Sequence, residues 1–114
     1  MVIFAAKREP NSGKIHVTSP GPGPWVNGSI QAATWRSDDP ELPQDKSVIV
    51  ETYQSLPDND KLILSLGQVK YTAAQKQFEI TNDYPKNGVF YVLVSVADDL
   101  STFGTSSYFT IAQN

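Results

Sequence analysis

The chain has 114 residues, of which 39% are hydrophobic and 18% charged, as expected of one globular domain rather than a disordered chain. Its formal net charge is −3, and a nucleic-acid partner, which calls for a clustered basic face, is not expected. No apolar run approaches the roughly 20 residues of a membrane span. Cysteine is absent, which excludes disulfides and thiolate metal sites.

Residues 1–13 form an N-terminal segment ahead of a single domain predicted for residues 14–114. Met1–Ala6 is apolar and fits either an edge strand or a frayed end. It is too short for the apolar core of a secretory signal, so an exported form would need a leader outside this sequence. Lys7-Arg8 is a dibasic pair of the kind that secretory processing proteases cut, although adjacent basic residues are more commonly just solvated.

Turn signals separate a series of short apolar runs that alternate at period two, the pattern of β-strands. The first run places Ile15 and Val17 on one face and His16 on the other, and a stiff proline-rich loop, 19–24, follows it. Residues 98–105 are expected to be a connecting loop. The predicted strands are 14–18, 29–36, 47–54, 62–71 with a bend at Gly67, 77–81, 87–98 and 107–112.

The strongest of these strands is 87–98, which begins at an Asn-Gly turn and is almost entirely β-branched or aromatic. Its inward row is wholly apolar, and its outward row is half apolar, which predicts a central strand. The inward row is Phe90, Val92, Val94 and Val96, and the outward row is Tyr91, Leu93 and Ser95.

About seven short strands without a convincing helix predict an all-β fold, a two-sheet antiparallel sandwich of the immunoglobulin or fibronectin type III kind. A small barrel is the competing architecture. The sandwich is favoured because the aromatic core candidates come from well-separated strands. These candidates are Trp35, Phe78, Phe90 and Phe109.

Residues suited to catalysis are scarce. His16 is the single histidine and has no partner that spacing places beside it, which argues against a Ser-His-Asp site. The paired carboxylates Asp38-Asp39 and Asp98-Asp99 point to opposite faces, unlike those of glycosidases. Asp58-Asn59-Asp60 offers oxygens to calcium, but the loop lacks the further ligands. We therefore expect no enzymatic activity, no cofactor and no metal.

Binding residues are predicted on the outer face of the central strand. If the strands that begin at Ser47 and Ser107 flank it, Tyr53, Tyr91 and Tyr108 lie on the same outward side. Aromatic rings with polar tips on an exposed sheet contact a sugar ring, a protein partner or a second copy of the chain. The alternative is that Met1–Ala6 or a loop covers these tyrosines.

Trp25 is a second candidate for binding. Pro22 and Pro24 hold the chain extended, so Trp25 arrives at the mouth of the loop already ordered and suits either a sugar-stacking platform or a lid over the end of the core. Asn27-Gly28-Ser29 matches the N-glycosylation sequon. A glycan on Asn27 is therefore predicted if the chain is secreted.

Several landmarks occur in an order that resembles a known family: 15–20, 23–28, Thr34-Trp35, 91–94 and 107–111. The chain resembles the fungal Ser/Thr-rich, GPI-anchored cell-wall family over roughly residues 14–112. That family shares its extracellular module with the yeast killer-toxin-resistance proteins of β-1,6-glucan assembly. The resemblance implies a secreted sandwich domain, a role in cell-wall glucan organisation and no known catalytic residues. The family's leader and GPI-signalled tail are absent from this sequence, as in a soluble secreted variant or a trimmed chain.

The expected function is that of a non-catalytic, secreted module of the fungal cell surface, located extracellularly or in the cell wall, that binds or organises wall polysaccharide such as β-glucan. The alternative is a protein–protein module that self-associates, for example as a homodimer, through the exposed sheet face or an edge strand.

Overall fold

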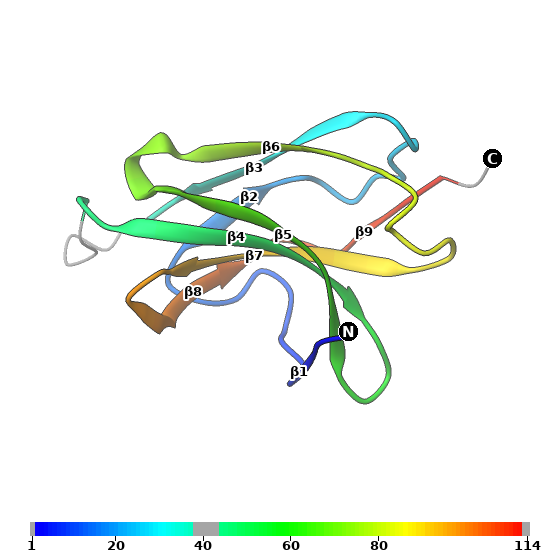
Figure 1. The fold of residues 1–114 in the computed structure, drawn as a ribbon, viewed down its shortest axis with the longest axis horizontal. Helices are drawn as coiled ribbons and strands as arrows, with labels where there is room; N and C mark the ends of the chain where they lie inside the picture. The colour runs from blue at the N-terminus through cyan, green and yellow to red at the C-terminus, as the bar shows by residue number, and fades with distance from the viewer. Residues whose placement is uncertain (1, 38–43, 113–114) are drawn as a thin grey trace.

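The computed structural model describes residues 2–37 and 44–112. These residues form an all-β protein with antiparallel sheets and without an α-helix (Figure 1). The prediction of an all-β, antiparallel fold is therefore confirmed, and the arrangement is consistent with a β-sandwich. Met1, the acidic pair Asp38-Asp39 and most of the loop predicted before the strand at Ser47 lie outside the described residues.

The larger sheet has the strand order β1-β5-β4-β7-β8, with β9 paired to β7, and the smaller sheet has the order β2-β3-β6. The larger sheet consists of β1 (Phe4–Ala5), β4 (Ser47–Ser55), β5 (Asp60–Lys70), β7 (Val89–Val96), β8 (Asp99–Thr105) and β9 (Phe109–Thr110). The smaller sheet consists of β2 (His16–Ser19), β3 (Ile30–Arg36) and β6 (Gln75–Glu79). A short 3-10 turn, η1 (Tyr71–Ala73), leads into β6. The prediction that the strand around Val92 is central is confirmed, because β7 lies between β4 and the β8–β9 side.

The main core lies between the sheets. The inward row of β7 and all four predicted core aromatics are buried there. Trp35 is 3% exposed, and its indole nitrogen donates to the Tyr71 carbonyl over 2.9 Å. Tyr84 and Tyr71 complete the core although the sequence pattern did not indicate them. Trp25 is half-buried.

The expectation that residues 98–105 are a loop is wrong, because Asp99–Thr105 form β8. Its sequence, Asp-Leu-Ser-Thr-Phe-Gly-Thr, is polar and carries no alternating apolar row, so nothing in the pattern marked it as a strand. β8 pairs with the second half of β7, with Ser95 opposite Phe103. The last strand, expected over residues 107–112, is reduced to β9 and pairs with β7 only at Val89 and Phe90.

Gly13, just ahead of β2, and Gly104 of β8 form an isolated bridge. A Cβ atom on Gly104 would lie 1.8 Å from the Ile15 carbonyl oxygen, and one on Gly13 would lie 2.1 Å from the Phe103 carbonyl oxygen. Only glycine fits at either position. Ile15 N–H donates to the Phe103 carbonyl over 3.1 Å, so β8 contacts the start of the smaller sheet.

The N-terminal segment runs along the larger sheet, away from the smaller one (Figure 1). β1 pairs with the start of β5, with Phe4 opposite Lys61 and Ala5 opposite Asp60. Farther along, Asn11 N–H donates to the Ser106 carbonyl over 3.1 Å. Residues 2–12 therefore cross the outer face of the larger sheet from its β5 edge to its β8–β9 edge.

Candidate functional site

The three predicted tyrosines come together on this outer face. Tyr53 of β4 and Tyr91 of β7 are cross-strand partners, and their rings stack with centroids 5.6 Å apart and planes 12° apart. Tyr108 lies next to Tyr91 at 6.2 Å between ring centroids. We call these residues the tyrosine face.

The tyrosine face is not exposed as expected. Tyr53 is 6% and Tyr91 1% exposed, and only Tyr108 remains half-buried. The N-terminal segment covers the face: Ala5 packs against it, and the Arg8 guanidinium carbon lies 5.1 Å from the centre of the Tyr53 ring, within cation–π range. The alternative that Met1–Ala6 or a loop covers the tyrosines is therefore closer to the molecule: Ala5 belongs to the predicted stretch, and Arg8 lies just beyond it.

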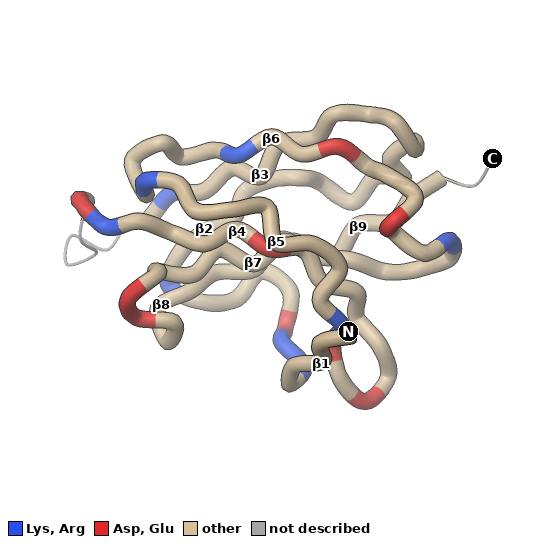
Figure 2. Tube along the Cα trace, in the orientation of Figure 1, with Lys and Arg blue, Asp and Glu red and all other residues tan. Residues whose placement is uncertain are grey.

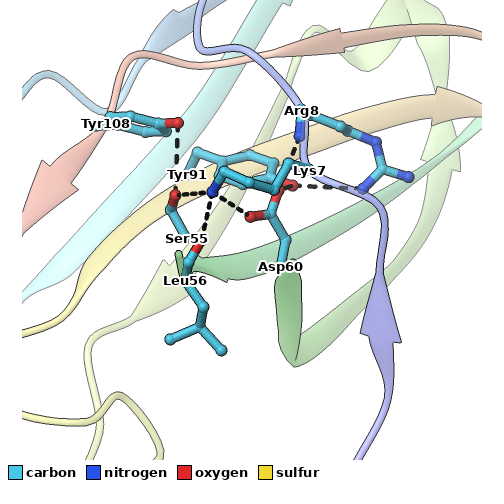
Figure 3. Close-up of polar contacts among 7 residues, drawn as sticks. All are labelled: Lys7, Arg8, Ser55, Leu56, Asp60, Tyr91 and Tyr108. Carbon is cyan, nitrogen blue, oxygen red and sulfur yellow. Dashed lines mark hydrogen bonds and ion pairs between the residues drawn. The ribbon is translucent and has the colours of Figure 1, made fainter. Parts of the chain in front are cut away.

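A buried carboxylate holds this cover in place (Figure 3). Asp60 is fully buried and accepts hydrogen bonds from the Tyr91 hydroxyl over 2.6 Å and from the Arg8 backbone N–H over 3.0 Å. Lys7 Nζ lies 3.3 Å from its other oxygen. A buried carboxylate is tolerated only when it is paired and hydrogen-bonded. Two of its three partners belong to the N-terminal segment. We call Asp60, Tyr91, Lys7 and Arg8 the Asp60 cluster.

Further contacts extend the Asp60 cluster. Lys7 Nζ also donates to Ser55 Oγ over 3.0 Å and to the Leu56 carbonyl, and Arg8 Nη1 donates to the Tyr91 hydroxyl over 3.4 Å. Burial, together with the hydrogen bond to Asp60, raises the pKa of the Tyr91 phenol, so this hydroxyl stays a donor at neutral pH. The dibasic pair Lys7-Arg8 therefore anchors the N-terminal segment to the larger sheet. The two residues are engaged in these contacts, rather than simply solvated or presented as an unengaged protease site.

A cleft of about 310 Å³ opens beside the Asp60 cluster, and we call it the outer cleft. It combines two opposite charges with aromatic and aliphatic surface. Burial raises the pKa of the Glu51 carboxyl, although the Arg8 charge opposes the shift, so this carboxyl is short of hydration. The lining residues are Arg8, Glu51, Tyr53, Leu93, Ser95, Leu100 and Phe103.

A second cleft, of about 410 Å³, lies at the end of the sheets where Asn27 is found, and we call it the end cleft. Asn27 is exposed, and its amide nitrogen donates to Asn82 Oδ1 over 2.6 Å. The one aromatic residue of the lining, Tyr84, is 4% exposed, and its hydroxyl lies 3.0 Å from Thr52 Oγ1. The lining residues are Asn27, Thr81, Asn82, Tyr84, Pro85, Lys86, Ile111 and Ala112.

Trp25 does not line the end cleft. Its indole nitrogen donates to the Gly21 carbonyl over 2.9 Å, and its ring packs against the main core. Its backbone is bonded to the last strand and the residues after it, because Trp25 N–H donates to the Thr110 carbonyl and Ala112 N–H donates to the Trp25 carbonyl. These contacts favour the lid hypothesis over the platform hypothesis.

Other kinds of site find little support in residues 2–37 and 44–112. No group of three or more His, Cys, Asp or Glu side chains there could hold a metal ion, and the Asp60 oxygens are already occupied by donors. No helix in the same residues is long and apolar enough to cross a membrane. Lys and Arg are spread along the chain among acidic residues (Figure 2).

The sequence did not predict that Asp60 and Phe103 contribute to the outer face of the larger sheet. Asp60 belongs to the loop sequence Asp58-Asn59-Asp60, and an acidic residue in such a turn ordinarily faces water. One available signal was its phase: Asp60 lies two residues before Leu62, which packs against the tyrosine face. Phe103 lies in the stretch 98–105, which the sequence predicts to be a connecting loop.

Comparison of the chain with protein-family models, curated proteins and solved structures finds no match.

Proposed function

We propose that this protein is a non-catalytic polysaccharide-binding module and that the outer cleft is its sugar-binding subsite. One observation carries the proposal: the cleft places the oppositely charged Arg8 and Glu51 beside the Tyr53 and Phe103 side chains. Sugar rings present an apolar face of C–H groups and a rim of hydroxyls. A site that combines aromatic surface with planar charged groups matches both features.

Each lining residue has a defined part in this proposal. The Glu51 carboxylate accepts hydrogen bonds from two neighbouring hydroxyls, and the Arg8 guanidinium donates to hydroxyl or ring oxygens from a fixed planar fork. Glu51 is already partly desolvated, so less hydration is lost when a ligand replaces water. Phe103 supplies the stacking surface, because Tyr53 is covered on one side by Arg8.

The volume of the outer cleft, about 310 Å³, is at the lower end for small-molecule sites. It therefore suits a short stretch of a chain that continues past the cleft on either side. The end cleft is the weaker candidate, since its only aromatic residue is buried and its ring has no free face. Asn27 is better suited to carry a glycan there, at the opposite end of β7 from Ser95.

The resemblance to the fungal cell-wall family makes β-glucan the first ligand to test. In this proposal the chain is an immunoglobulin- or fibronectin-like domain that is secreted to the cell surface or wall. Tyr91 takes no direct part in this proposal, because the N-terminal segment covers it. Tyr53 contributes one wall of the cleft, and Tyr108 lies beyond its lining.

The test is binding to β-1,3- and β-1,6-glucan oligosaccharides by calorimetry or glycan array, with wild type, Glu51→Gln and Phe103→Ala. Glu51→Gln keeps the side-chain shape but removes the charge. We expect it to weaken binding about tenfold or more, the equivalent of one charge-assisted hydrogen bond. Phe103→Ala should weaken binding further.

The matched control is Glu79→Gln on β6, an exposed glutamate of the smaller sheet, which should leave affinity unchanged. Absence of binding to every glycan by the folded wild type would overturn the proposal. So would binding that survives both outer-cleft substitutions.

A further inference from the structure

β1 leaves unusually large apolar side chains in solvent. Val2, Ile3 and Phe4 are 54%, 47% and 56% exposed, although they belong to or adjoin a strand of the larger sheet. Outside the Asp60 cluster, the main attachment of these residues is the short ladder to β5, including the bond from Leu62 N–H to the Ile3 carbonyl at 2.9 Å. A two-residue edge strand of this kind opens easily without unfolding the rest.

The surface beneath the segment offers hydrogen-bond partners for its basic side chains. Lys7 and Arg8 meet Ser55, Asp60 and Tyr91, which are 48 or more residues away along the chain. None of these contacts depends on the segment and the sheet belonging to the same chain. A second copy presents an identical segment and an identical acceptor surface.

The chain is fixed again directly after the segment. Ser12 N–H donates to Thr105 Oγ1 over 2.9 Å, Thr105 N–H donates to the Ser12 carbonyl over 2.9 Å, and the Gly13–Gly104 crossing follows. Asn11, immediately before, has φ 53°, a left-handed conformation that asparagine adopts more readily than most non-glycine residues. Two bonds also tie the intervening residues to the β8 side, because Thr105 Oγ1 donates to the Glu9 carbonyl over 2.7 Å and Asn11 N–H donates to the Ser106 carbonyl over 3.1 Å. Movement of the segment therefore pivots at residues 9–11 and breaks these two bonds.

We propose that the N-terminal segment is an exchangeable strand and that two copies of this protein form a dimer by trading residues 2–10. Each segment then pairs with β5 of the other copy, and its Lys7 and Arg8 bind the partner's Asp60 and Tyr91. Closed two-fold exchange of this kind needs no new surface. The two hinges lie side by side in such a dimer, and the exposed apolar residues at positions 2–4 gain a second chain to pack against.

The exchange also bears on ligand binding. Arg8 lines the outer cleft, so in the dimer each cleft is completed by the other copy. This last consequence rests on the proposed sugar-binding function, whereas the exchange itself does not.

The test uses the absence of native cysteine. Phe4 and Lys61 are partners, and the bond between Ile3 and Leu62 makes them a non-hydrogen-bonded pair, whose Cα separation of about 4.5 Å suits a disulfide. Two single-cysteine variants, Phe4→Cys and Lys61→Cys, are mixed, incubated and mildly oxidised. A disulfide between them forms efficiently only if the segment of one copy lies on β5 of the other.

The control mixes Phe4→Cys with Lys76→Cys, which replaces another half-buried lysine on the smaller sheet. At a protein concentration of about 1 mM, near the effective concentration of the segment on its own chain, we expect the Phe4–Lys61 heterodimer to exceed the control by about tenfold. Equal yields from both mixtures would overturn the proposal.

A second measurement protects against misfolded single variants. The double variant Phe4→Cys/Lys61→Cys, oxidised at low concentration, locks the segment onto its own sheet and should sediment as a monomer at concentrations where wild type forms dimers. A wild type that stays monomeric over the same range, or a locked variant that dimerises equally well, contradicts strand exchange. Neither result depends on a glycan, so failure here and failure of the sugar-binding proposal are separate outcomes.

Discussion

The two faces of β7 are built on different physical grounds. The inner face carries Phe90, Val92 and Val94, all fully buried against the smaller sheet, and its stability comes from apolar area removed from water. The outer face carries Tyr91 and Leu93, which are also buried, at 1% and 4% exposed. That face is covered by a short segment, which is held by the β1–β5 ladder and by one carboxylate with its hydrogen bonds.

This difference separates global from local stability. Loss of an inner side chain removes contacts on which both sheets depend, so the whole domain must respond. Loss of a partner in the Asp60 cluster releases residues 2–10 and leaves the two sheets packed. Variants of the two faces should therefore differ in which part of the chain opens, as well as in the size of the stability loss.

The largest effect is expected on the inner face, for Trp35→Ala. It removes a large aromatic side chain that is 3% exposed and donates a hydrogen bond to the Tyr71 carbonyl. The free energy of unfolding, measured by urea denaturation, should fall by about 3–5 kcal/mol. Trp25→Ala is the matched comparison, because Trp25 is only half-buried, and it should cost clearly less. Equal losses for the two tryptophans would contradict the assignment of Trp35 to the core.

An intermediate effect is expected on the outer face, for Asp60→Asn. The amide removes the charge that attracts Lys7 and weakens the hydrogen bonds from Arg8 and Tyr91, a loss of about 2 kcal/mol. Trypsin should then cut after Lys7 or Arg8 roughly 30-fold faster, while the remaining fragment stays resistant. Asp58→Asn, an exposed position in the same turn, is the control and should change little. Cleavage spread over the whole chain would show that the segment and the sheets open together.

The smallest effect concerns pH and Glu51. Burial raises the pKa of this carboxyl above its ordinary value near 4.5, so the folded state holds the proton more tightly than the unfolded chain. The corresponding stability is fully present below the unfolded pKa and is lost as pH rises through the folded pKa. Glu51→Gln stays neutral, so its melting temperature should gain on that of wild type as the pH rises from about 4 through the raised folded-state pKa. Parallel melting curves for the two proteins would contradict a buried, poorly hydrated Glu51.

The inner face was predictable because its signal is local. The alternation of Val48, Val50 and Thr52, or of the inward row of β7, depends only on neighbours along one strand, and the pleat converts it directly into burial. Trp35, a core candidate from a predicted strand, is buried accordingly. The gathering of Tyr53, Tyr91 and Tyr108 also followed from phase, once the strands were placed next to each other.

The outer face was only half predictable, because what covers it comes from elsewhere in the chain. Whether Tyr91 faces water depends on Lys7 and Arg8 reaching Asp60, contacts that span more than 50 residues. No periodicity encodes such a pairing. β8 was not predicted for a related reason. Its pairing with β7 and its contact with Gly13 stabilise a strand whose own sequence has weak strand character.

Gly13 and Gly104 carry a further consequence, for the recognition of distant relatives. Their contact places two glycines at opposite ends of the chain, one ahead of β2 and one inside β8, and any side chain at either position would meet a carbonyl oxygen. Gly13 is exposed, so a scoring scheme that equates exposure with tolerance would discount it. A chain that shares this crossing should keep both glycines even where the surrounding residues have diverged, which makes their joint presence a more telling criterion than identity along any one strand.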